Sequence, residues 1–151
     1  MSWKEQKSRE EFWRVYEDRI GEKVFAYALG RYISGWTGYD QPFWGLLIVS
    51  AGGFRFHHFP HEGWLNAAAR AVSGGEPPEE KVLFIPAGRI IKAELYLETV
   101  WWKRLFLPSP PMMDIRYLDD SGAEQQFRAE TDAKAERLAE FLKGLKDDKP
   151  R

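Results

Sequence analysis

The chain has no cysteine among its 151 residues, which excludes disulfides and thiolate metal sites. An excess of either charge is also missing, because 22 Lys and Arg residues stand against 23 Asp and Glu, a formal net charge of −1. Without a basic surplus there is no general electrostatic attraction to a polyanion, so we expect no nucleic-acid partner. No apolar run approaches the roughly 18 residues of a membrane span, and the charged segment 1–11 does not read as a signal peptide. These absences predict a cytoplasmic protein.

Aromatic residues, by contrast, make up 15% of the chain and include seven Trp. Some of these rings must line a core, but the number is large for a small interior, so we expect one or more on a working surface. The length fits a single domain. Within residues 1–151 we expect a helical extension over 1–21, a core over 22–145 with an insertion at 60–80, and a tail over 146–151.

Two helices are predicted in the first half of the chain. Ser8 and Glu11 have the spacing of a capping box, and apolar residues then recur at helical spacing as far as Ile20, where a glycine follows. A shorter apolar face predicts a second helix over 64–73. Both are predicted as additions to a mainly β core.

The C-terminal segment carries the clearest amphipathic pattern. Thr131 is a typical N-cap residue, and a helix that follows it has one apolar stripe. The stripe consists of Ala135, Leu138, Ala139, Leu142 and Leu145. Because such a stripe must be covered, we expect this helix to dock on a sheet.

The segments with β-branched, aromatic or alternating residues predict about seven strands. They lie at 22–34, 43–50, 54–59, 82–85, 90–97, 113–117 and 124–129. Gly52 and Gly53 predict a tight reversal, and Asp119 to Gly122 a hairpin turn in which Asp serves the backbone. An irregularity is expected at 86–88. The predicted fold class is α+β, mainly β, with antiparallel strands.

The order of elements in the last third of the chain resembles the pleckstrin-homology-like superfold. The likeness is carried by three segments that precede the terminal helix: 81–90, Trp101–Phe106 and 114–122. The likeness is to the bacterial pleckstrin-homology and GRAM-type domains, and it spans about 22–145. It implies an antiparallel β-barrel or sandwich of about seven strands, with the 131–145 helix plugging one open end. It also implies a scaffold that binds lipid headgroups, peptides or proteins and rarely catalyses.

In lipid-binding members of this superfold, cations near the first strand pair contact phosphates. Here the cations of that region are only Lys23, Arg31 and Arg55, so the resemblance implies no phosphoinositide site of the usual kind. The loop between them instead carries Trp36 and Tyr39. Those rings suit either a contact surface or a lid over the mouth of a barrel.

The main candidate contact residues are Trp101, Trp102, Lys103 and Arg104. Large amphipathic rings beside cations suit a membrane interface or the aromatic and acidic residues of a partner. The simpler alternative is an edge strand in which Trp102 and Phe106 pack inward. The sequence leaves both interpretations open.

His57, His58 and His61 are the only histidines, and their closeness raises the possibility of a zinc or nickel site. In a strand, however, His57 and His58 point to opposite faces, and no cysteine is present to complete a ligand set. The simpler interpretation is three surface histidines with no metal or cofactor. Since no nucleophile with its base and no phosphate loop is recognisable either, we predict that the protein is not an enzyme.

Three functional hypotheses result. The first is a non-enzymatic binding or assembly module that contacts a protein partner, or a second copy of itself, through 101–104 and through Trp36 and Tyr39. The second is peripheral attachment to anionic membrane lipid through Trp101, Trp102 and the two cations that follow. The third is a histidine-based metal enzyme.

Overall fold

The computed structural model describes residues 3–36, 41–58, 81–97, 100–107, 109–132 and 134–147. Several predictions fall outside these residues. They concern the helix over 64–73, the insertion at 60–80, Tyr39, His61 and the last four residues of the tail.

Seven strands form one antiparallel sheet in the order β4-β3-β2-β1-β7-β6-β5. The strands are β1 (Val24–Ser34), β2 (Phe43–Ser50), β3 (Gly53–His58), β4 (Lys81–Pro86), β5 (Ile90–Tyr96), β6 (Met112–Leu118) and β7 (Glu124–Glu130). The helices are α1 (Trp3–Ile20), α3 (Trp101–Phe106) and α4 (Ala135–Asp147), and the 3-10 turn η1 (Ala87–Arg89) joins β4 to β5. The predicted fold class, α+β and mainly β, is confirmed.

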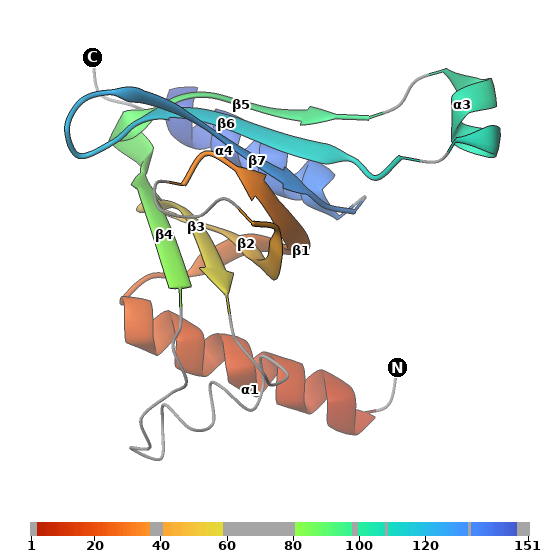
Figure 1. The fold of residues 1–151 in the computed structure, drawn as a ribbon. Helices are drawn as coiled ribbons and strands as arrows, with labels where there is room; N and C mark the ends of the chain where they lie inside the picture. Colours follow the sequence, from red (N-terminus) through yellow and green to blue (C-terminus); the bar gives the residue numbers. More distant parts are fainter. Residues whose placement is uncertain are drawn as a thin grey trace.

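The sheet is open, which corrects the expectation of a barrel. Within the described residues β4 and β5 are the two outer strands and do not pair with each other. Instead the sheet folds over, so that β5, β6 and β7 cross β1 to β4 (Figure 1). The predicted irregularity after Pro86 is η1, the turn at which the chain passes from one outer strand to the other.

Aromatic rings fill the space between the two halves of the sheet. Tyr32 of β1, Phe56 of β3 and Phe127 of β7 are fully buried, and the ring of Phe127 lies 5.4 Å from that of Phe56 and 5.9 Å from that of Tyr32. Phe54 belongs to the same cluster. Part of the aromatic excess of the sequence is therefore core.

The terminal helix α4 completes this core, as predicted. Leu138 and Leu142 are fully buried and pack in the same cluster as the aromatic rings. The prediction of Thr131 as N-cap is wrong, because its hydroxyl donates to the carbonyl oxygen of Leu29 (2.8 Å) in β1. The side chain of Asp132 instead forms a hydrogen bond just before the helix, where its carboxylate accepts from the amide of Lys134 (2.9 Å).

Helix α1 covers the opposite face of the sheet. Phe12 and Tyr16 pack with Leu46 and Ile48 of β2, whose neighbours along the strand face the other core. The helix ends at Ile20 and is followed by Gly21 with a positive φ of 73°, as predicted. It begins at Trp3, however, so Ser8 lies inside the helix and its prediction as a cap is wrong. The residues over 4–7 are strong helix formers, which carry the helix beyond the expected start.

Candidate functional site

Residues 101–106 form the short helix α3, in the long connection between β5 and β6. It lies at the right in Figure 1, where the connection projects farthest from α1 and α4. The alternative of an edge strand for these residues is therefore wrong. The amide of Arg104 donates to the carbonyl of Val100 (3.1 Å), and the amide of Leu107 to that of Lys103 (2.8 Å).

The side chains of α3 and of the next residue are exposed. Trp101 is 70% exposed and Phe106 is 75% exposed, while Leu105 and Leu107 are nearly as accessible. Trp102 is 45% exposed, so the expected inward packing of Trp102 and Phe106 is also wrong. We call residues 101–107 the α3 tip. Neighbouring large apolar side chains that remain exposed are typical of a binding surface.

The α3 tip is amphipathic despite its short length. At 100° per residue, Trp101, Leu105, Trp102 and Phe106 fall within an arc of about 140°. Lys103 and Arg104 take the rest of the circumference, and Lys103 places its ammonium 5.6 Å from the ring centre of Trp102. The helix contains no acidic residue. It therefore presents an apolar arc bordered by positive charge.

Trp36, the other predicted contact residue that the structure describes, closes one end of the core. Its amide donates to the hydroxyl of Tyr32 (2.8 Å), and its ring contacts Tyr32, Phe43 and Phe56. Of the two roles that the sequence suggests for Trp36, a lid over the core therefore fits better than a contact surface. Trp36 packs on the core and α3 projects from it, so the structure does not bring Trp36 and the α3 tip together.

The histidines occupy two different surroundings on β3. His57 is buried and its Nδ1 lies 3.1 Å from the hydroxyl of Tyr16 in α1, so the prediction of a surface residue is wrong for it. His58 lies on the other face, with Nδ1 2.6 Å from the carbonyl oxygen of Trp44. Among the described residues no three His, Cys, Asp or Glu side chains form a group that could hold a metal ion.

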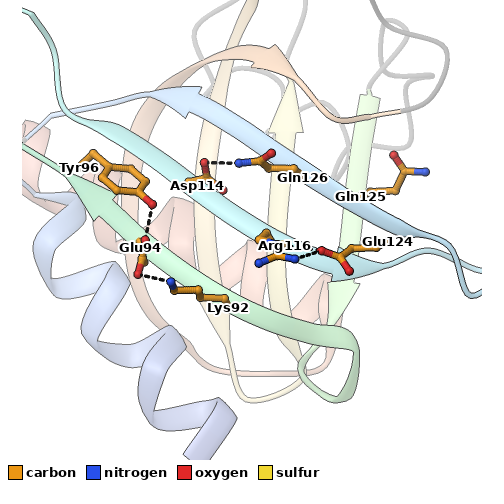
Figure 2. Close-up of a pocket in the computed structure, with 8 residues that line it drawn as sticks. All are labelled: Lys92, Glu94, Tyr96, Asp114, Arg116, Glu124, Gln125 and Gln126. Atoms are coloured by element: carbon orange, nitrogen blue, oxygen red, sulfur yellow. Dashed lines mark hydrogen bonds and ion pairs between the residues drawn. The ribbon is translucent and has the colours of Figure 1, made fainter.

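Sequence reasoning did not single out a polar pocket on the outer face of β5, β6 and β7. Figure 2 shows this open pocket, whose volume is about 530 Å³. It is lined by Lys92, Glu94, Tyr96, Asp114, Arg116, Glu124, Gln125 and Gln126. The signal in the sequence was the alternation of polar and apolar residues along 90–97, which places every second side chain on this outer face.

Charges in this pocket are balanced by neighbouring side chains. Lys92 pairs with Glu94 (2.8 Å) and Arg116 donates from Nε to Glu124 (2.8 Å), while Asp114 accepts from Gln126 (2.6 Å). The hydrogen bond between Lys92 and Glu94 raises the pKa of the ammonium and lowers that of the carboxylate, so both stay charged. Pairs within one strand, such as Lys92 with Glu94, and pairs between strands, such as Arg116 with Glu124, are typical of a solvated sheet face. We therefore assign the paired side chains of this pocket to stability.

Two of the three cations near the first strand pair, Arg31 and Arg55, are also neutralised. Arg31 lies 3.6 Å from Glu130, and Arg55 lies 3.3 Å from Glu22. The carboxylate of Glu22 also accepts from the hydroxyl of Ser50 (2.6 Å), and this bond is the main reason why the pKa of Glu22 is lowered. Neither arginine is thus available as an unpaired cation for a phosphate.

No family model matches the chain, and neither the curated proteins nor the solved structures contain a match. Among the described residues, no helix combines the length and the apolar character that crossing a membrane requires.

Proposed function

We propose that the protein is a non-enzymatic attachment module that binds the interface of anionic membranes through the α3 tip. The observation that carries this proposal is the exposure of the tip's large apolar side chains on a projecting helix that also carries two cations. Trp, Phe and Leu on one arc with Lys and Arg beside them form the pattern of helices that lie in a membrane interface.

A pleckstrin-homology-like scaffold is part of the proposal. The antiparallel strand order, with β1 beside β7 and a C-terminal helix packed into the core, supports it. The proposed site differs from that of lipid-binding members, because it lies between β5 and β6 instead of at the first strand pair, where Arg31 and Arg55 are already paired.

The magnitudes indicate that apolar burial contributes more than charge. Complete burial of one Leu or Phe side chain is worth about 1.5–3 kcal/mol, and the tip exposes several such residues. Each cation near an anionic leaflet adds about 1 kcal/mol, and α3 has two. We therefore expect salt to weaken the binding without abolishing it. The anionic surface in this proposal is the inner leaflet, which agrees with the expected cytoplasmic location.

The same apolar side chains would also suit contact with a protein partner or with a second copy of the chain. That contact is the first hypothesis from the sequence. Two features favour the membrane. The cations border the apolar arc, as an interface between hydrocarbon and charged headgroups requires. The tip also projects from the body, so it can enter a lipid surface without rearrangement of the core.

Sedimentation with phosphatidylcholine vesicles that contain phosphatidylserine tests the proposal. We expect the protein to sediment with the vesicles at low salt, and a double variant, Leu105→Ser with Phe106→Ser, to remain in the supernatant. Lys103→Glu with Arg104→Glu should weaken binding by tenfold or more, because each reversal replaces an attraction of about 1 kcal/mol with a repulsion. Trp44→Ser is the matched control, since Trp44 is 57% exposed on β2 and should leave binding unchanged.

Two outcomes contradict the proposal. One is a wild-type protein that stays in the supernatant at low salt. The other is binding that survives the double variant. If, in addition, light scattering detects a dimer that Leu105→Ser with Phe106→Ser converts to monomer, the tip binds a second copy and not a membrane.

A further inference from the structure

Another exposed tryptophan lies at the start of α1. Trp3 is 72% exposed, and the ammonium of Lys7 lies 5.2 Å from its ring centre. Lys4 is exposed as well. The segment 3–9 contains three cations and only one acidic residue, Glu5, so this end of the helix combines an accessible indole with positive charge.

Helical geometry keeps these side chains away from the body. At 100° per residue, Trp3, Lys7 and Lys4 fall within an arc of about 100°. The residues that pack on the sheet, Phe12 and Tyr16, lie on the other side of the same helix. The exposed arc at the start of α1 therefore faces outward, where a second surface can contact it.

The position of this end of α1 in the molecule relates it to the α3 tip. In Figure 1 the N-terminal end of α1 and the helix α3 both lie at the right, whereas the C-terminal end of α1 lies at the left. The start of α1 and the α3 tip thus lie on the same side of the protein in this view.

We infer that the start of α1, with Trp3, Lys4 and Lys7, is a second contact with the anionic membrane. The inference rests on the proposed function of the α3 tip and extends that interface. Once the tip is bound, the second contact forms within one molecule at a high effective concentration, so even a weak contact increases the overall affinity. Two separated contacts also fix the orientation of the protein on the membrane.

The absence of cysteine allows a direct test by single labelling. An environment-sensitive fluorophore is attached to Leu107→Cys in the tip, to Lys4→Cys at the start of α1, or to Asp18→Cys at the far end of the same helix. All three positions are exposed. On addition of vesicles that contain phosphatidylserine, we expect the emission of the first two labels to shift to the blue and that of the Asp18→Cys label to stay unchanged.

Affinity provides an independent measurement. Trp3→Ser with Lys7→Glu should weaken vesicle binding about tenfold, with the melting temperature unchanged because both side chains are exposed. Lys23→Glu is the matched charge reversal beyond the other end of α1, and it should have little effect. The inference is wrong if the tip label responds while the Lys4→Cys label does not, or if the Trp3 and Lys7 variant binds like wild type. If the tip label does not respond either, the proposed function itself fails.

Discussion

At the scale of single residues, Asp119 shows how one carboxylate organises a turn. It follows β6, where the sequence predicts an Asp that serves the backbone. Its Oδ1 accepts from the hydroxyl (2.6 Å) and the amide (2.9 Å) of Ser121 and from the amide of Ala123 (2.9 Å), and Oδ2 accepts from Gln125 (3.0 Å). These bonds, that from the Ser121 hydroxyl first, lower the pKa of Asp119 to about 2.

This lowered pKa predicts a pH-dependent effect of Asp119→Asn. A carboxyl whose pKa is lower in the folded protein stabilises it above the unfolded value, near 3.8, and this contribution is lost as the pH falls towards 2. We expect the variant to be less stable than wild type at pH 7 and the difference to shrink between pH 4 and pH 2. Thermal unfolding across this range measures it. Asp120→Asn is the control, since Asp120 is fully exposed and an equal difference there would contradict the assignment.

A second residue-scale prediction concerns the junction between α1 and the sheet. Tyr16→Phe removes the hydroxyl that lies 3.1 Å from Nδ1 of the buried His57. Because the histidine then loses a buried hydrogen-bond partner, we expect a loss of about 1–3 kcal/mol in the free energy of unfolding, measured by urea denaturation. Tyr27→Phe removes the hydroxyl of a half-buried ring that packs on Trp13, and we expect a smaller loss. Equal losses would show that the His57 contact contributes little.

At the scale of elements, Gly35 determines how the end of β1 meets β7. Its φ of 98° is rarely adopted by other residues, and a Cβ atom there would overlap the backbone of Gln126. The hydroxyl of Tyr117 donates to the carbonyl oxygen of Gly35 (2.8 Å), which fixes this approach from β6. The glycine is thus needed for space as well as for its conformation.

This double requirement predicts a large effect of Gly35→Ala. We expect it to cost more than about 3 kcal/mol of stability, because backbone strain and overlap with β7 act together. Gly122→Ala is a close control: its φ of 84° is also positive, but a Cβ atom there meets nothing within 4 Å. We expect about 1 kcal/mol for that variant. If chemical denaturation gave similar losses of stability for Gly35→Ala and Gly122→Ala, β7 would have to move to make room for the new side chain at position 35.

Elements with a regular periodicity were predictable from the sequence. The expected strand over 43–50 has the same bounds as β2, and the expected apolar stripe near the C-terminus is the buried face of α4. Each of these two predictions depends on many residues that follow one pattern, and tertiary contacts reinforce that pattern. The failures rest on few residues. The cap at Ser8 depended on two side chains. In Trp101–Phe106 a helix of six residues is too short to be distinguished from a strand by its periodicity.

For the candidate site, the sequence predicted which residues take part but not the structure that they adopt. The rings and cations of 101–104 were named from their composition, and the structure exposes them on a helix instead of a strand. The burial of His57 and the packing of Trp36 depend on α1 and on Phe43 and Phe56, contacts between distant parts of the chain that no local pattern records. For the same reason the polar pocket on β5 to β7 was missed, since it exists only when three strands lie side by side.

At the scale of the whole molecule, the structure separates the groups that maintain the fold from those that we propose to bind. The core lies between the halves of the sheet and α4, where Leu138 and Leu142 are fully buried. The α3 tip is outside this core, and no residue of α3 is buried. Because exposed side chains lose no contacts with the body when they are replaced, substitutions in the tip should change binding but not stability.

Calorimetry of two apolar truncations tests this separation. Leu142→Ala creates a cavity beside α4 and should cost about 2–5 kcal/mol. That loss corresponds to a decrease in the melting temperature of about 5–20 °C for a domain of this size. Phe106→Ser removes a larger side chain, but one that is 75% exposed, so the melting temperature should stay within about 2 °C of the wild-type value. A comparable decrease for Phe106→Ser would mean that the α3 tip packs on the body in solution, and a docking role that requires free rings would then be untenable.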